Sequence, residues 1–555
     1  MLARLLMLIE KRWEPANNNM KNTSLTTIEI LKSAAQRYPD QEIVSALADE
    51  SVHRYRYKDA FTRCNKLAIA LKKLGIGKQA NVGTLAANHY RHLEVMFAVS
   101  GVGAVYHPIN AHLVRAQLQF IINHAENVCL FVDLAYLPQL ELLADNIPSV
   151  KHIVVLCTAE QMPAESAFDL LCYETLIAYE PLCFEWPSLS QDSPSGLCYS
   201  SGTTGDPKGV IYENGSTAQH ASVTGSSQFH GFDEWSVVMP VVPFYFINAW
   251  GVPYAAVFYG AKLVLPGCAI VPENVQGLIE TEEVTHAYAV PDVWRRLHQY
   301  LQKSDLPIDS LQTIGAGGDP SPLELVKAYA QKYGVYWMGL WGMVETSPLV
   351  SAASRCPYIE QLPEDERFQK QASAGRAVLG IEIEIFDALG RALPHDGKTM
   401  GNIRIRGPWV AEGYFSEEPS ENFVDGWFES GDVGMIDDHG YITLLDRSKD
   451  VIRSGGEWIV SVELEQAAMQ YEAIDRVCVV GALHEKWHER PIMLLTLRPN
   501  MAFSEYRLRK VLQQQVNSWW MPDAILVVDE LPVSGTGKLK KIEVRNEYRH
   551  YLLHK

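Results

Sequence analysis

The sequence predicts an α/β protein with a large amino-terminal domain of parallel-rich sheets flanked by helices and a small α+β domain at the carboxyl end. A chain of 555 residues is too long for one hydrophobic core. From about residue 27 to 190, helical and strand-like periodicities alternate, which is typical of parallel sheets covered by helices on both faces. Residues 447–555 mix helices with strands and are numerous enough for a separate small domain.

The first elements follow from residue spacing. We expect helices at 27–38 and at 58–74, the second ended by Gly75, and a third from His89 to Val99. His89 and His92 are expected on the surface of that third helix, without a chemical role. Apolar runs predict strands at 42–46, 79–85, 128–133 and 152–156.

Composition excludes several classes of protein. With 47% hydrophobic and 21% charged residues the chain is an ordinary globular protein, and a net charge of -18 argues against a nucleic-acid partner. Its nine cysteines are scattered, without a Cys-x-x-Cys pair, which is typical of reduced, mostly buried thiols in the cytoplasm. No window reaches the roughly 20 apolar residues of a membrane span, and residues 1–9 favour a short amphipathic turn over a signal peptide.

The densest functional pattern lies at residues 199–210. Glycines let the backbone fold tightly around an anion, hydroxyls add neutral donors, and a lysine supplies positive charge. This combination predicts a phosphate-binding loop, although the spacing is not that of a Walker A motif and a plain polar surface loop is the alternative. Its candidate residues are Ser200, Ser201, Gly202, Thr203, Thr204, Gly205 and Lys208.

Two further strand ends should meet this loop, because ligands bind at the carboxyl ends of parallel strands. One strand runs through 310–316 into Gly317, Gly318 and Asp319, and the helix after it is expected to begin with Ser321 as its cap. The other passes through 335–338 and leads to residues 340–346.

Four later segments complete the pattern. An Asp-Gly turn at 425–426 precedes Asp432, whose carboxylate could accept both hydroxyls of a ribose. A charged segment at 446–450 is followed by a glycine-rich loop at 454–458, and a Gly-Thr-Gly-Lys turn ends at Lys538. Taken singly, each of these could be a solvated turn or linker.

Together and in this order, the motifs resemble those of the adenylate-forming superfamily of acyl-CoA synthetases, luciferases and peptide-synthetase adenylation domains. The resemblance extends over about residues 27–550 and is closest to medium- and long-chain fatty-acyl-CoA synthetases, because Asn-Ala-Trp-Gly at 248–251 and Ser-Gly-Gly-Glu-Trp-Ile at 454–459 accompany the shared motifs. It implies that a small-molecule carboxylate, a fatty acid, reacts with MgATP to give acyl-AMP and pyrophosphate, and that CoA then takes the acyl group. The implied cofactors are ATP, Mg²⁺ and CoA.

The resemblance also implies roles and boundaries. The large domain would cover residues 1–446 and the mobile small domain 447–555, with Lys449 as hinge. The implied catalytic residues are Lys208, Lys538 and Glu345, and Glu345 would also hold Mg²⁺ together with Thr203. The other implied residues are Gly317, Gly318, Asp319, Trp341, Gly342, Val344, Asp432 and Arg447 for the nucleotide; Phe246, Trp250 and Gly251 for the acyl group; and Ser454, Gly455, Gly456, Glu457 and Trp458 for the CoA side.

Three residues depart from the family pattern. Asp319 places a carboxylate close to the expected acyl pocket, where small residues are common. Val344 stands where a threonine usually donates to the α-phosphate, and Phe246 stands where acyl-CoA synthetases usually have histidine. An adenylating enzyme that passes its acyl group to a carrier protein or an amine, and a weakly catalytic nucleotide- or acyl-binding protein, therefore remain alternatives. A homodimer is also left open.

Overall fold

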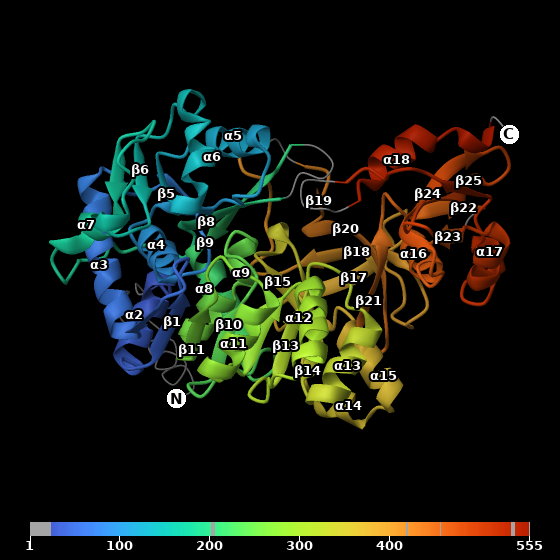
Figure 1. Ribbon diagram of the computed structural model, residues 1–555, viewed down its shortest axis with the longest axis horizontal. Helices are drawn as coiled ribbons and strands as arrows, with labels where there is room; N and C mark the ends of the chain where they lie inside the picture. Colours follow the sequence, from blue (N-terminus) through green and yellow to red (C-terminus); the bar gives the residue numbers. More distant parts are fainter. Residues whose placement is uncertain (1–23, 201–205, 418–419, 456, 534–538, 554–555) are drawn as a thin grey trace, which may run out of the picture.

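Two large sheets form the body of the protein (Figure 1). The structure is a computed structural model that describes residues 24–200, 206–417, 420–455, 457–533 and 539–553. Most neighbouring strands in both sheets are parallel, and antiparallel pairs occur only toward the edges of the two sheets within the described residues. The α/β prediction is therefore confirmed.

The nine-stranded sheet carries the two strand ends that the sequence analysis singled out. Its order is β16-β15-β14-β13-β12-β10-β11-β1-β2. The strands are β1 (Glu42–Ala46), β2 (Val52–Arg56), β10 (Val237–Pro240), β11 (Lys262–Leu265), β12 (His286–Ala289), β13 (Thr313–Ala316), β14 (Tyr336–Gly342), β15 (Leu349–Ala352) and β16 (Arg376–Ala377).

The seven-stranded sheet ends in the hairpin that holds the predicted phosphate loop. Its order is β7-β6-β5-β3-β4-β8-β9. The strands are β3 (Asn81–Leu85), β4 (Val105–Pro108), β5 (Cys129–Val132), β6 (His152–Val155), β7 (Leu170–Cys172), β8 (Pro194–Tyr199) and β9 (Gly209–Glu213).

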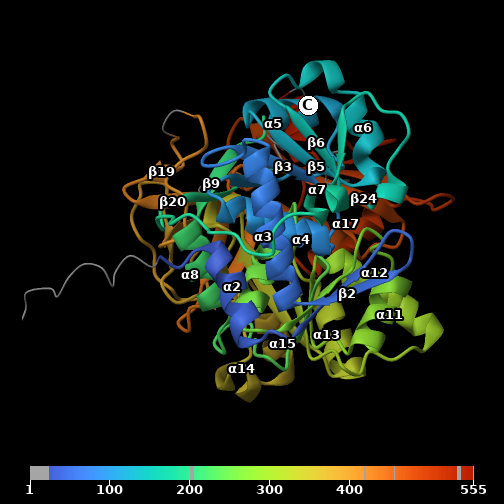
Figure 2. The same ribbon diagram turned by 90° about the vertical axis from the view of Figure 1, so that its left-hand side faces the viewer.

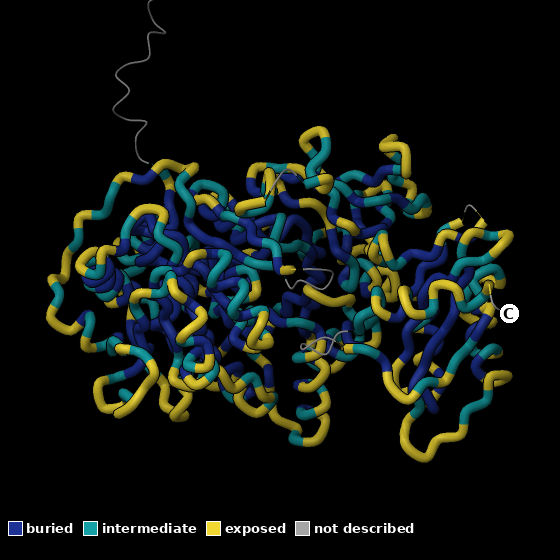
Figure 3. Tube along the Cα trace, turned by 90° about the horizontal axis from the view of Figure 1, so that it is seen from above, coloured by how far each residue is buried: buried dark blue, intermediate teal, exposed yellow. Residues whose placement is uncertain are grey.

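A layer of helices lies between these two sheets and forms the largest hydrophobic core. Figure 2 shows the amino-terminal helices of this layer, and Figure 3 shows that the buried backbone is concentrated in the interior of the large body. The core helices are α2 (Thr27–Arg37), α3 (Tyr57–Lys73), α4 (Tyr90–Gly101), α8 (Asn214–Gly225) and α10 (Val252–Phe258).

Other helices cover the outer faces of the two sheets. The helices α11 (Pro272–Glu282), α12 (Pro291–Ser304), α13 (Leu323–Tyr333) and α15 (Glu364–Ala372) pack on the nine-stranded sheet. The seven-stranded sheet is covered by α5 (Arg115–His124) and α6 (Leu137–Glu141). Each sheet is thus buried on both faces, which explains why its strands read as continuous apolar runs.

Two local predictions were wrong. His89 and His92 are buried, because α4 lies inside the molecule and not on its surface. The cap of α13 is Pro322, without a side-chain hydrogen bond, because the Ser321 hydroxyl instead accepts a hydrogen bond from Trp337 Nε1 at 2.9 Å. In both cases a long-range contact overrides the local pattern.

A third, antiparallel sheet adjoins the large body. It contains β17 (Glu382–Phe386), β18 (Gly401–Arg406), β19 (Phe423–Val424), β20 (Trp427–Ile436) and β21 (Ile442–Arg447). The predicted Asp-Gly turn joins β19 to β20, and both turn residues have positive φ, as a two-residue hairpin requires.

The carboxyl-terminal elements follow β21 and lie at one end of the molecule (Figure 1). Their sheet contains β22 (Ile452–Ser454), β23 (Glu457–Ile459), β24 (Ile474–His484), β25 (His488–Leu497) and β26 (Ala524–Val527). The accompanying helices are α16 (Ser461–Ala468), α17 (Glu505–Gln513) and α18 (Lys541–Tyr548). They pack around their own hydrophobic clusters.

None of the helices in the described part of the chain is both long and apolar enough to cross a membrane.

Candidate active site

The predicted phosphate loop connects the antiparallel strands β8 and β9. Its two ends are fixed to each other, because Ser200 N donates to Lys208 O at 2.8 Å and Lys208 N donates to Ser200 Oγ at 3.0 Å. The ammonium group of Lys208 lies 2.9 Å from a carboxylate oxygen of Glu417. The candidates at 201–205, including Thr203, lie outside the described residues.

Tyr414 links the two residues predicted to handle phosphate and Mg²⁺. The Lys208 Nζ lies 4.4 Å from the centre of the Tyr414 ring, and the Tyr414 hydroxyl donates to Glu345 Oε1 at 2.9 Å. Asn422 Nδ2 in turn donates to the Tyr414 hydroxyl at 3.2 Å. Burial raises the pKa of Tyr414, so its hydroxyl stays protonated and remains a donor.

Backbone contacts hold these segments together. Tyr212 of β9 donates its hydroxyl proton to Val344 O at 2.8 Å, and Ala411 N donates to Glu345 O at 2.8 Å. Phe415 N donates to Gly209 O at 2.8 Å. The hairpin loop, the segment after β14 and residues 411–415 therefore converge, as the topology of parallel sheets predicts.

A second group of predicted nucleotide residues lies around Asp432. Its carboxylate accepts a hydrogen bond from Trp341 Nε1 at 3.2 Å and lies 3.0 Å from Arg447 Nε across the β20–β21 pair. Desolvation raises the pKa of Asp432, while Arg447 and the indole N–H oppose that shift. The arrangement unites one residue from the nine-stranded sheet with two from the third sheet.

A cavity of about 270 Å³ opens beside Glu345. Most of its wall comes from the third sheet, with Ser448 from the segment after β21 and Arg453 from β22. Glu345 makes one side-chain hydrogen bond among the described residues, through Oε1, so Oε2 remains for a ligand. A carboxylate with a spare oxygen at a polar cavity fits a hard cation such as Mg²⁺.

The predicted glycines have a steric reason to be glycine. A Cβ on Gly342 would lie 2.0 Å from Pro348 O, and one on Gly317 would lie 2.9 Å from Leu340 O. Gly318 has a φ of +82°, and Asp319 after it is exposed. Val344 packs beside an apolar cluster that contains Cys198, Val210 and Tyr212.

The predicted acyl residues form an unusual turn. Residues 247–250 all have φ between 49° and 57°, followed by Gly251 at 74°, so the short element α9 (Ile247–Trp250) is left-handed. Each non-glycine residue there costs roughly 1–2 kcal/mol, and such strain persists only where the surroundings impose it. Phe246 is 40% exposed, whereas Trp250 is buried.

His220, which the sequence analysis missed, packs under this turn. A Cβ on Gly251 would lie 2.6 Å from its ring, and its Nε2 accepts a hydrogen bond from Leu349 N at 3.2 Å. Burial lowers the pKa of His220 to about 3, so the ring is neutral and able to accept.

The predicted hinge and CoA-side loop lie together after β21. Lys449 is exposed, and Ser448 donates its hydroxyl proton to Asn402 Oδ1 at 3.0 Å. Ser454 ends β22 and accepts a hydrogen bond from the buried Arg490, and Glu457 and Trp458 belong to β23, which pairs with β22. Gly456 and Lys538 lie outside the described residues.

Sequence reasoning also missed Tyr414, Glu417 and Asn422. The one available signal was the Gly-Tyr pair at 413–414 in a loop, which is too common to single out.

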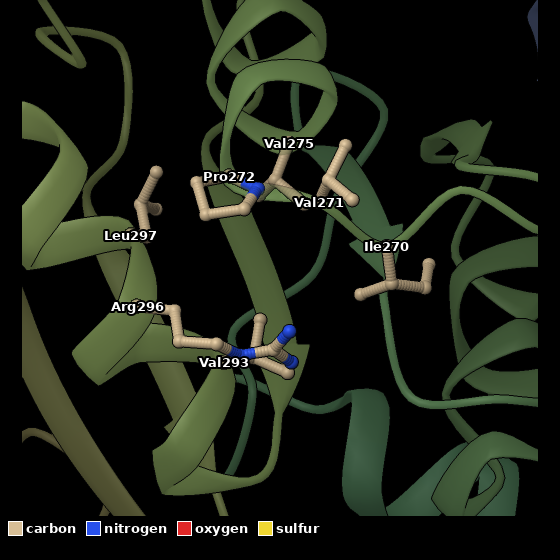
Figure 4. Close-up of a pocket in the computed structure, with 7 residues that line it drawn as sticks. All are labelled: Ile270, Val271, Pro272, Val275, Val293, Arg296 and Leu297. Atoms are coloured by element: carbon tan, nitrogen blue, oxygen red, sulfur yellow. The ribbon is translucent and has the colours of Figure 1, made fainter.

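A separate hollow between α11 and α12, shown in Figure 4, is lined by apolar side chains and Arg296 and contains none of the predicted site residues.

Comparisons with known proteins agree with this picture. Residues 31–415 match the AMP-binding enzyme family, and residues 463–538 match the AMP-binding enzyme C-terminal domain. The chain is 38% identical to a 3-methylmercaptopropionyl-CoA ligase of Ruegeria lacuscaerulensis, covering 96% of this chain and 99% of that protein. It is 37% identical to a medium-chain-fatty-acid CoA ligase of Ectopseudomonas oleovorans, covering 96% and 98%.

Solved structures show the same fold. An anthranilate CoA ligase in complex with anthranoyl-AMP superimposes with a TM-score of 0.79 at 24% identity, covering 95% of this chain and 98% of that one. The chain therefore belongs to the AMP-binding enzyme family within the adenylate-forming superfamily, and it is an acid–thiol ligase that uses ATP, Mg²⁺ and CoA.

Proposed function

We propose that this enzyme activates a carboxylic acid of the fatty-acid class and transfers it to CoA. In the first step a carboxylate oxygen attacks the α-phosphorus of ATP, and the bond to pyrophosphate breaks. In the second step the thiolate of CoA attacks the acyl carbonyl and AMP leaves. Such displacements depend on positioned charges and donors more than on a covalent nucleophile.

The observation that carries this proposal is the convergence of Lys208 and Glu345 on Tyr414. A phosphate that replaced Glu417 beside Lys208 would gain a charge-assisted contact next to a carboxylate already oriented by a tyrosine. Glu345, with Thr203, would hold Mg²⁺, which when bound offsets the negative charge of the phosphates.

The remaining roles belong to the same proposal. Asp432 and Arg447 would exchange part of their ion pair for the ribose hydroxyls, with Trp341 beside the base. Lys538 would approach the α-phosphate, and residues 454–458 would face CoA after rotation near Lys449. We also keep three further predictions: a domain boundary between residues 446 and 447, a cytoplasmic location, and a homodimer.

The test measures the two half-reactions separately. Purified enzyme with MgATP should release pyrophosphate with straight-chain carboxylic acids, and acyl-CoA should form only when CoA is added. Lys208→Ala should lower pyrophosphate release, while Lys327→Ala, which removes a surface lysine paired with Asp365, should not. Pyrophosphate release without any thioester product would point instead to a different acyl acceptor.

A further inference from the structure

Gly315 of β13 has no side chain, and the ring of Tyr288 fills the space where one would lie. Tyr288 stands opposite Gly315 in the parallel β12–β13 register. A Cβ on Gly315 would lie 2.2 Å from Tyr288 Cδ1, so the ring lies directly against the glycine. Tyr288 is fully buried, in the layer between the two large sheets.

Trp250, proposed to contact the acyl group, lies against the outer end of the same segment. A Cβ on Gly318 would lie 3.9 Å from Trp250 Cζ2. Gly318 lies three positions after Gly315, and an extended strand rises about 3.3 Å per residue. The two rings therefore bracket at most about 10 Å of this segment, within the same hydrophobic layer.

A hydrogen bond and close packing hold the side chain of Tyr288 in its position. Its hydroxyl is hydrogen bonded to His230 Nδ1 at 3.1 Å, and the ring of His230 stacks on Phe232 with 4.9 Å between centroids. Burial lowers the pKa of His230, so the imidazole is neutral and can accept the tyrosine proton. Moving the tyrosine would break this buried hydrogen bond and empty a packed position, both of which are costly.

We propose that Tyr288, held by His230, closes the inner end of the acyl site, so that the enzyme selects short-chain carboxylic acids over long-chain fatty acids. This inference rests on the proposed function, because it takes Trp250 as the outer boundary of the acyl site. A long acyl chain spans about 15 Å, half the thickness of a bilayer core of about 30 Å. It is therefore longer than the backbone between the two ring contacts, which spans about 10 Å at most.

The first test is the chain-length profile of the unmodified enzyme, measured as pyrophosphate release with butanoate, octanoate and hexadecanoate. We expect kcat/KM for butanoate to exceed that for hexadecanoate by at least about tenfold, because the longer chain fits only if packed side chains at the closed end are displaced. Equal or higher kcat/KM with hexadecanoate would overturn the inference and leave the proposed function intact. Absence of pyrophosphate release with every acid would overturn both.

The second test removes the ring. Tyr288→Ala should raise kcat/KM for hexadecanoate by about tenfold or more without raising it for butanoate, while Tyr288→Phe should keep the original preference. Tyr329→Ala is the matched control, because Tyr329 is fully buried in the cluster on the opposite face of the same sheet. If Tyr288→Ala does not fold, Tyr288→Leu replaces it, and a folded Tyr288→Leu with an unchanged profile would contradict the inference.

Discussion

Tyr414 shows how much of the candidate site depends on one residue that the sequence did not reveal. Its ring lies under the Lys208 ammonium group and its hydroxyl holds Glu345, which is 69 residues away in the chain. Local patterns could single out Lys208 as a candidate phosphate ligand because the loop around it is rich in glycine and hydroxyl groups. They could not identify Tyr414, because its significance comes entirely from long-range contacts.

Removing the Tyr414 hydroxyl should therefore weaken catalysis without unfolding the site. Tyr414→Phe keeps the ring below Lys208 but loses a hydrogen bond to a carboxylate, typically about 1.5–3 kcal/mol. We expect kcat/KM for acyl-AMP formation to fall about 10- to 100-fold. The control is Tyr441→Phe, which removes a hydroxyl that contacts Cys356. An unchanged rate in Tyr414→Phe would show that Glu345 does not need this donor.

Protonation of His92 should lower the stability of the folded protein at acid pH. Burial lowers its pKa to about 4, and its ring is hydrogen bonded to Tyr106, Thr84 and the carbonyl of Ala87. Because the folded-state pKa lies below the unfolded value of about 6.5, the stabilisation is fully present above pH 6.5 and is lost as pH falls toward 4. At pH 5, protonation of His92 is expected to lower the free energy of unfolding by about 2 kcal/mol.

Chemical denaturation at pH 7 and pH 5 measures this loss. His92→Gln should be less stable at pH 7, because it disturbs the buried hydrogen bonds, but its stability should fall less between the two pH values. His439→Gln, which changes an exposed histidine, should behave like the unmodified protein. An equal fall in His92→Gln would mean that other groups cause the acid sensitivity.

At the scale of elements, periodicity predicted most of the framework. The expected helix at 27–38 and strand at 42–46 correspond to α2 and β1, because burial on fixed faces leaves a regular pattern in the sequence. The strand predicted at 335–338 continues to Gly342 in β14. The left-handed turn at 247–250 could not be predicted, since isoleucine, alanine and tryptophan disfavour positive φ and only tertiary packing imposes it.

The effect of a glycine-to-alanine substitution on stability should depend on what surrounds the added Cβ. Gly342→Ala would place a Cβ 2.0 Å from the backbone oxygen of Pro348, so β14 and β15 must separate. We expect a loss of stability of at least about 1–3 kcal/mol, together with weaker ATP binding beside Trp341. Thermal unfolding and nucleotide titration measure the two effects.

Gly277→Ala is the matched control. Gly277 lies inside α11, and nothing would lie within 4 Å of its added Cβ. Since glycine is about 0.5–1 kcal/mol worse than alanine in a helix interior, this variant should be more stable with unchanged activity. Equal effects of the two substitutions would contradict the steric account of Gly342.

At the scale of the whole molecule, a small cluster of side chains among the described residues joins the third sheet to the carboxyl-terminal elements. Asp446, on β21 of the third sheet, accepts hydrogen bonds from Ser461 N at 2.7 Å and Ser461 Oγ at 2.6 Å at the start of α16. Lys541 Nζ also donates to Ser461 Oγ and pairs with the partly buried Glu465. The described orientation of the small domain therefore depends on this cluster and on the short segment that follows β21.

Lys449 is the position in that segment where a rigid residue should be tolerated. The N–H groups of Ser448, Asp450 and Val451 each donate to a backbone carbonyl, whereas Lys449 N–H makes no hydrogen bond within the described part of the chain. Proline removes only that N–H and fixes φ, so Lys449→Pro should preserve whichever orientation it accepts and prevent rotation away from it.

We expect Lys449→Pro to keep acyl-AMP formation within about tenfold of the unmodified enzyme and to lose most CoA thioester formation, because only the second step would need the rotated small domain. Pyrophosphate release without CoA and thioester formation from supplied acyl-AMP measure the two steps. The control is Lys449→Ala, which leaves the backbone able to rotate and should preserve both steps. Ser504→Pro is unsuitable as a control, because Ser504 N–H donates a hydrogen bond to the Tyr471 hydroxyl. If Lys449→Pro retains both activities, the rotation axis lies elsewhere, and the bonds from Ser461 to Asp446 become the next group to change.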